Sequence, residues 1–128
     1  MKGRLFLFTF LFTLLLLTAC NQQPKPEIDI SKTVGMTEDY FRQLDEISTT
    51  ASSYSEEQVK FRLMVEKHPS QQEATAMFNR ILDKLEQNSH FPEFWDYYNG
   101  YFDIKSYDKG VIYQASKVIG EGLRVTSK

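Results

Sequence analysis

Few side chains in this 128-residue sequence have a type and a spacing that could carry chemistry. The one cysteine is Cys20, and the two histidines, His68 and His90, lie far apart in the sequence. Neither histidine has a second one three or four residues away, the spacing that places two metal ligands on one helix face. Neither a Gly-x-Ser-x-Gly motif nor a phosphate-binding glycine loop is present. We therefore expect no metal, no cofactor and no catalytic residue, and interpret the chain as a non-enzyme.

The residues that precede Cys20 have the layout of a secretory signal. Two positive charges in Met1–Arg4 precede an apolar run over Leu5–Leu17. The small residues Thr18 and Ala19 then lead directly into Cys20, which completes the layout of such a signal. The apolar run is shorter than the ~20 residues that cross a bilayer as a helix. The sequence therefore predicts a signal that is removed; the alternative is an uncleaved anchor beside an unrelated cysteine.

The four residues Leu17-Thr18-Ala19-Cys20 resemble the lipobox of bacterial lipoproteins. The resemblance covers residues 1–20, and no family is recognised for residues 21–128. It implies that the Cys20 sulfur receives a diacylglycerol and that the chain is cut between Ala19 and Cys20. Two or more acyl chains anchor a protein stably in a membrane. In a host with two membranes, Asn21 replaces the aspartate that retains such lipoproteins in the inner membrane, which implies the outer membrane, at its periplasmic face or surface.

Composition restricts the partners of the mature chain. A single cysteine cannot form an internal disulfide, so none is expected to hold the domain. Of the 15 basic residues, Lys2 and Arg4 leave with the signal while all 17 acidic residues remain, so the net charge falls from −2 to about −4. This charge argues against nucleic acid and against attraction to anionic headgroups. We therefore expect the lipid on Cys20 to be the membrane contact.

Beyond the signal peptide of residues 1–19, the chain divides into two parts. Residues 20–36 contain the lipidated cysteine and a polar segment with two prolines and a glycine, which predicts a flexible tether. Fully extended, this tether would reach roughly 50 Å. Residues 37–128 are predicted to form one small domain.

Helical spacing of apolar residues predominates in the predicted domain. It predicts helices over 37–54, 71–88 and 91–102, and a last helix after Ser106. The helix over 59–67 is predicted from its start signal, a cap at Ser55 followed by an acidic first turn. The most specific signals are two capping boxes, Ser55-Glu56-Glu57-Gln58 and Ser70-Gln71-Gln72-Glu73. The expected fold class is therefore all-α, a small bundle of four to five helices behind a signal peptide and a flexible tether.

Two segments admit strands instead of helices. Apolar residues at every second position from Val59 to Val65 have the period of a half-buried strand. Asn99-Gly100 is the strongest two-residue signal for a hairpin, which would pair Tyr97 with Phe102. The alternative fold is therefore α+β, with a hairpin at Asn99-Gly100.

Eight aromatic residues lie between Phe91 and Tyr107. They form either the domain core or, in part, an exposed binding face, because tyrosine and tryptophan combine a large area with a polar tip. The candidate partner-binding residues are Trp95, as an anchor, and Tyr97 and Tyr101 at one edge of the aromatic arc.

These features together predict a membrane-anchored small lipoprotein of the bacterial envelope that acts as a non-enzymatic protein-interaction module. It would be an accessory component of an envelope or secretion assembly, or an exclusion or immunity lipoprotein. The alternative is a small-ligand or glycan-binding lipoprotein that uses the aromatic segment 91–107.

Overall fold

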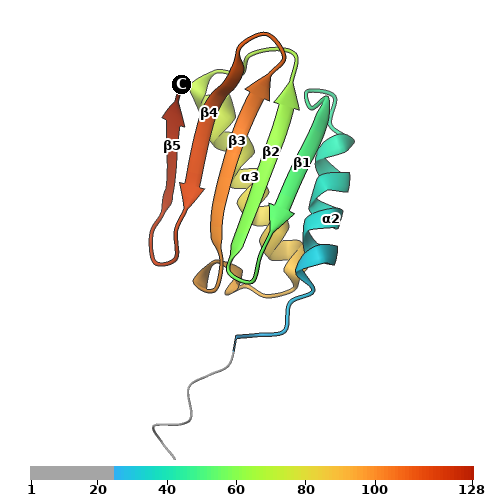
Figure 1. The fold of residues 1–128 in the computed structure, drawn as a ribbon, viewed down its shortest axis with the longest axis vertical. Helices are drawn as coiled ribbons and strands as arrows, with labels where there is room; N and C mark the ends of the chain where they lie inside the picture. The colour runs from blue at the N-terminus through green and yellow to red at the C-terminus, as the bar shows by residue number, and fades with distance from the viewer. Residues whose placement is uncertain (1–24) are drawn as a thin grey trace, which may run out of the picture.

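The structure, a computed structural model, describes residues 25–128 of the chain. This part of the chain holds two α-helices, a single 3-10 turn and five strands (Figure 1). In chain order the elements are α2 (Ile30–Arg42), β1 (Thr49–Tyr54), β2 (Gln58–Val65), α3 (Gln71–Ser89), η1 (Phe94–Asp96), β3 (Asn99–Ser106), β4 (Gly110–Lys117) and β5 (Leu123–Ser127).

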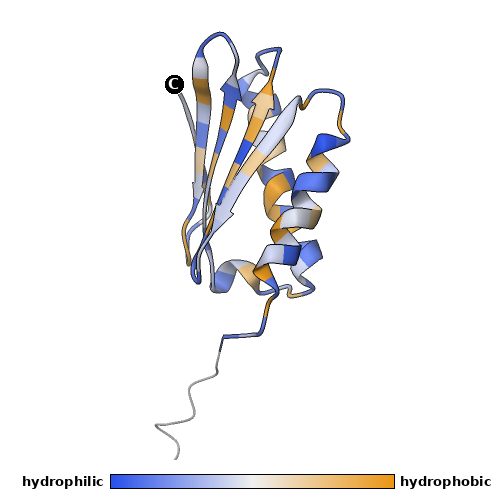
Figure 2. Cartoon of the chain, turned by 45° about the vertical axis from the view of Figure 1, so that its right-hand side comes forward, coloured by the Kyte–Doolittle hydropathy of each residue, from blue (hydrophilic) through white to orange (hydrophobic). Residues whose placement is uncertain are grey.

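The five strands form one sheet in the order β1-β2-β3-β4-β5. Strands β2 and β3 run parallel, and all other neighbours run antiparallel. Because a parallel pair needs a crossover, helix α3 makes the connection between β2 and β3. Both helices pack on the same side of the sheet, so the domain has two layers and the other sheet face is open (Figure 2).

The expectation of an all-α bundle is wrong, and β2 shows why. Its residues Val59, Phe61, Leu63 and Val65 are all buried, while the residues between them are half-buried or exposed. This alternation is the period of a strand with one covered face, so the strand alternative for 59–65 is confirmed. The predicted capping box at 55–58 is instead a turn, in which the Ser55 N–H donates to the Gln58 carbonyl at 2.8 Å.

Helix α3 confirms the helix predicted over 71–88. Its capping box is complete: the Ser70 hydroxyl accepts from the Glu73 N–H at 3.1 Å, and the Glu73 carboxylate accepts from the Ser70 N–H at 3.2 Å. The helix buries Ala74, Phe78, Ile81 and Leu85 against the sheet. Both the start signal and the apolar period therefore agree with the fold here.

Helix α2 begins seven residues before the predicted helix over 37–54. Asp29 caps it by accepting from the Lys32 N–H at 3.1 Å, so residues 30–36 are helical and not part of a flexible tether. The helix ends at Arg42, and the Ser/Thr-rich segment that follows forms edge strand β1. Serine and threonine are poor helix formers, and their small side chains fit a strand at the edge of the sheet.

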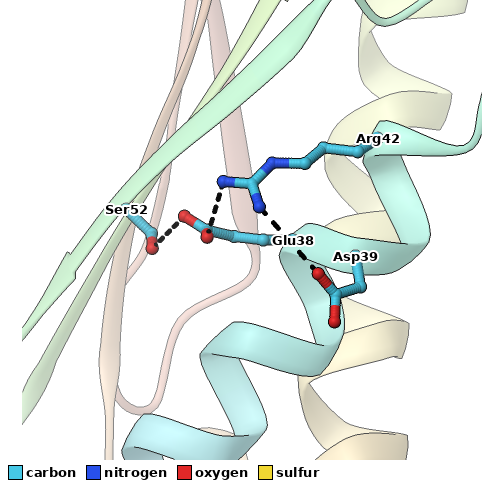
Figure 3. A network of polar contacts seen from close by, with 4 residues as sticks. All are labelled: Glu38, Asp39, Arg42 and Ser52. Atoms are coloured by element: carbon cyan, nitrogen blue, oxygen red, sulfur yellow. Dashed lines mark hydrogen bonds and ion pairs between the residues drawn. The ribbon is translucent and has the colours of Figure 1, made fainter.

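A polar cluster joins α2 to β1 (Figure 3). The Glu38 carboxylate accepts hydrogen bonds from the Ser52 hydroxyl and, at 3.0 Å, from the Arg42 guanidinium. A second Arg42 nitrogen lies 3.9 Å from Asp39. These contacts fix the helix against the edge strand on the covered side of the sheet.

The helix predicted over 91–102 is also wrong. Residues Phe94–Asp96 form one 3-10 turn, and β3 begins at Asn99. The alternative hairpin at Asn99-Gly100 does not form either, because Gly100 lies inside the strand and beneath the ring of Trp95. A Cβ atom at Gly100 would overlap the Phe102 ring and would lie 2.8 Å from the Trp95 ring. Glycine is therefore required here for close approach, not for a turn.

The last predicted helix is replaced by the hairpin of β3 and β4. The Ser106 hydroxyl accepts from the Lys109 N–H at 3.2 Å, which is the contact expected of a helix cap. Gly110 then adopts a φ of 75°, a left-handed conformation that ends the turn and starts β4. The hydrogen bond that would cap a helix therefore stabilises the turn of a hairpin instead.

Candidate interaction surface

The open face of the sheet is the surface least explained by the fold. It carries a shallow hollow of about 500 Å³ that crosses all five strands. In Figure 1 α3 lies behind the sheet and α2 lies beside its β1 edge, and Figure 2 shows both helices on the same side, so no described helix covers this face. We use "open face" for the residues that line the hollow and point away from the helices: Ala51, Ser53, Lys60, Arg62, Tyr101, Asp103, Gln114, Ser116, Arg124 and Thr126.

Strand alternation places these residues. On β3, Phe102 and Ile104 are buried on the helix side, so Tyr101 and Asp103 point to the open side. Register then places Lys60 of β2 beside Tyr101 and Arg62 beside Asp103. On the other side of β3, Ser116 and Gln114 of β4 occupy the matching positions.

Arg62 and Asp103 form an ion pair with two hydrogen bonds on the open face. Arg62 donates twice to the Asp103 carboxylate, from Nε at 2.7 Å and from Nη2 at 2.9 Å. Donation of hydrogen bonds to the Asp103 carboxylate raises the pKa of the Arg62 guanidinium above its ordinary value, although desolvation opposes the shift. Two parallel hydrogen bonds fix the plane of the guanidinium group. The pair therefore presents polar atoms in a fixed orientation next to Tyr101.

The charge of the open face is opposite in sign to the net charge of the whole chain, which is −2. Among the residues that line the hollow, Lys60, Arg62 and Arg124 are basic, and only Asp103 is acidic. Tyr101 lies among them with 40% of its surface exposed. Tyrosine and arginine are the residue types that contribute most to protein-binding surfaces. The arrangement therefore suits non-covalent recognition of a polar partner.

The three candidate binding residues do not form one surface. Trp95 is only 9% exposed, and its Nε1–H donates to the Leu82 carbonyl of α3 at 3.2 Å. It packs against Phe94 and Phe102 on the helix side, where Tyr97 is half-buried at the rim of the core. Tyr101 alone reaches the open face. Trp95 is therefore a core residue here and is not exposed as an anchor.

Most of the aromatic segment 91–107 lies in the core. Phe94, Tyr98 and Phe102 are all at most 3% exposed, and the rings of Phe94 and Tyr98 stack at 4.6 Å. Only Tyr101 and Tyr107 are well exposed, and Tyr107 lies in the β3–β4 turn, away from the open face. The interpretation of the aromatics as core therefore describes most of them.

The two histidines lie away from the open face. The His68 Nε2 atom is 2.8 Å from an Asp108 carboxylate oxygen, and this contact, with the Ser106 hydroxyl, lowers the pKa of Asp108 to about 2. His90 ends α3 with a φ of 61°. Within residues 25–128, no group of three or more histidine, cysteine, aspartate or glutamate side chains is placed to hold a metal ion.

Leu17, Thr18, Ala19 and Cys20, the residues that resemble a lipobox, lie outside the described residues, as do the predicted cleavage site and lipid attachment. In the described part of the chain, the helices are too short or too polar to cross a bilayer.

Sequence reasoning found Tyr101 but missed Lys60, Arg62, Asp103 and Arg124. Arg62 and Asp103 are 41 residues apart, and only the parallel pairing of β2 and β3 brings them together. The available signal was the alternation in β2, which assigns Lys60 and Arg62 to the face opposite Phe61.

Comparison of the chain with protein-family models, curated proteins and solved structures gave no match.

Proposed function

We propose that this chain is a lipid-anchored, non-enzymatic protein-interaction module of the bacterial envelope, and that it binds its partner through the open face. The observation that carries the proposal is an uncovered sheet face on which Tyr101 stands between three basic side chains. A surface with this composition supplies area from the ring and directed hydrogen bonds from the guanidinium groups. The lipid on Cys20 would keep the surface at a membrane.

The binding part of the proposal is tested by crosslinking the full chain in its native membranes. Tyr101→Thr keeps a residue that fits a strand but removes the ring. Tyr107→Thr is the matched control, since Tyr107 is 64% exposed but lies in the β3–β4 turn. We expect one specific crosslinked species in the wild type and in Tyr107→Thr, and its loss in Tyr101→Thr. Equal crosslinking by both variants, or no specific species at all, would count against the open face as the binding surface.

The anchoring part is tested with Cys20→Ser. Without the thiol there is no acceptor for the diacylglycerol, so the variant should remain uncleaved or be mislocalised while its domain still folds. The measurement is membrane fractionation together with the mass of the chain. A processed variant that still fractionates with the membrane would show that the lipoprotein interpretation is wrong.

The hollow also favours a second candidate, a small-ligand or glycan-binding lipoprotein. Its volume of about 500 Å³ lies within the range of small-molecule sites, and the Tyr101 ring, with Lys60 and Ser116 beside it, offers a surface on which a sugar ring can stack. Trp95 lies on the other side of the sheet, so its fluorescence would not report such binding. Calorimetric titration with cell-wall oligosaccharides separates the two functions, because a protein-binding face should give no heat.

A further inference from the structure

The first described residue, Lys25, limits the distance between the domain and the proposed lipid anchor. Two contacts fix Lys25 to the domain. Its ammonium group lies 4.0 Å from the centre of the Tyr98 ring and donates to the Glu56 carbonyl. An ammonium over an aromatic face is attracted by the electrons of the ring. The chain therefore already belongs to the folded domain at Lys25.

Only four residues, Asn21 to Pro24, lie between Cys20 and Lys25, so five Cα–Cα steps join the two. A segment of this length spans at most about 18 Å, whatever its conformation. The tether expected from the sequence ran to residue 36 and could reach roughly 50 Å. Docking of Lys25, together with the start of α2 at Ile30, removes most of that reach.

The point of attachment lies at one end of the strands. Besides the donation of Lys25 to the Glu56 carbonyl, the Glu57 carbonyl accepts from the Asn99 N–H at 2.9 Å, and the Asn99 side-chain oxygen accepts from the Ile119 N–H at 2.8 Å. Figure 1 shows the chain entering at this end, beside the β1–β2 and β4–β5 turns. We call this the near end and define it by residues 55–57, 91–98 and 118–122. The far end is the β3–β4 turn at 107–109.

We propose that the near end faces the headgroup layer of the membrane that holds Cys20, with the strands pointing away from that surface and the open face turned sideways. This inference rests on the proposed lipid anchor. The connecting chain is shorter than an eight-residue strand, which is about 26 Å long, and the bilayer excludes the domain from its own volume. The chain is therefore too short for the far end to rest on the lipid while the near end points away from it.

The charge of the near end fits a headgroup layer of low negative charge. The three segments that define it contain five exposed acidic residues and no basic one, and they remain net acidic when Lys25, which contacts Glu56, and Arg124, which pairs with Glu121, are counted with them. The five acidic residues are Glu56, Glu57, Glu93, Asp96 and Glu121. Like charges repel, so the near end should face zwitterionic headgroups such as phosphatidylethanolamine more closely than anionic ones. A sideways open face would meet a partner that lies in, or stands on, the same membrane.

The test places a donor dye on the full, acylated chain in phosphatidylethanolamine vesicles with acceptor dye on the headgroups. Ile119→Cys labels the near end, where Ile119 is 42% exposed, and Tyr107→Cys labels the far end. Gln114→Cys labels the exposed centre of the open face. The two ends differ in height by about 26 Å, so energy transfer should be at least about twofold higher from residue 119 than from residue 107, with residue 114 between them.

Two results would overturn the inference. Equal transfer from residues 119 and 107 would show a domain without this orientation, and the highest transfer from residue 114 would show the open face lying on lipid. A second variant carries ten Gly/Ser residues inserted after Asn21, which add up to about 35 Å of reach. Transfer from residue 119 should then fall towards the value for residue 107. Unchanged transfer would show that chain length does not hold the near end.

These outcomes are distinct from failure of the proposed function. Loss of the Tyr101-dependent crosslink with a normal pattern of energy transfer would reject only the binding surface. A flat pattern with an intact crosslink would reject only the orientation. A chain that carries no lipid would reject both the anchor and the inference that rests on it.

Discussion

The two faces of the sheet have opposite compositions, although they share the same strands. In β2 the helix side carries Val59, Phe61, Leu63 and Val65, all at most 2% exposed, whereas the open side carries Lys60 and Arg62. Burial of apolar area supplies most of the free energy of folding, so the helix side should determine stability. The residues of the open side should contribute little to the free energy of folding. The comparison predicts that substitutions on one face change the free energy of unfolding and those on the other change binding.

The largest expected effect comes from the centre of the covered face. Phe78 of α3 is fully buried and stacks on Phe102 at 6.5 Å between ring centres. Phe78→Ala removes the ring and leaves a cavity, so the free energy of unfolding should fall by about 3 to 5 kcal/mol. Urea denaturation followed by the fluorescence of Trp95, the single tryptophan, measures it. A loss below 1 kcal/mol would mean that the helix layer does not hold the sheet.

Gly100→Ala tests the same face by adding an atom. The new Cβ would meet the Phe102 and Trp95 rings well inside van der Waals contact. We expect a loss of about 1 to 3 kcal/mol, because the rings must shift in a packed core. Gly122→Ala is the matched control, since nothing lies within 4 Å of its Cβ and its φ is not in the left-handed range. If both glycines tolerate alanine equally, Trp95 is not packed over β3.

These core contacts show how far local sequence signals reach. Helix α3 was predictable because a capping box and a period of 3.6 residues coincide at Ser70. The box at Ser55 has no such period behind it, and the alternation of β2 was the better signal. In the aromatic segment, apolar residues are so dense that a helical arc and a strand fit equally well. The choice between helix and strand in this segment depends on tertiary packing, because β3 pairs with β2, 41 residues earlier in the chain.

Local sequence signals also predict only part of the candidate site. Tyr101 was predicted from the edge of a helical aromatic arc that does not form, and it reaches the open face because strand alternation turns it away from the buried Phe102. Its neighbours Lys60 and Ser116 come from two other strands, and their places follow from register alone. Register depends on which side of each strand is buried, and one sequence does not state that for β4, where a bulge shifts the pairing at Ile104/Lys105.

A smaller effect is expected from the ion pair of the open face. The Arg62 and Asp103 side chains are 39% and 20% exposed, so solvent screens their attraction. A double-mutant cycle with Arg62→Met and Asp103→Ala should give a coupling of about 0.5 to 1 kcal/mol in the free energy of unfolding. Arg124 and Glu121, 3.5 Å apart and 73% and 48% exposed, serve as the control pair and should show almost none. Coupling well above 1 kcal/mol would make the open face part of the folding core.

The smallest change in stability, and the largest in binding, is expected for Tyr101→Thr. The ring is 40% exposed and faces Lys60 and Ser116, and threonine suits a strand, so the free energy of unfolding should change by less than about 0.5 kcal/mol. The same variant should lose the partner crosslink. Phe78→Ala, examined at a temperature where it is still folded, should keep that crosslink, because its side chain lies on the helix side. A Tyr101 variant that loses stability but keeps the crosslink would contradict this assignment. The open face would then contribute to folding, and the binding surface would lie elsewhere.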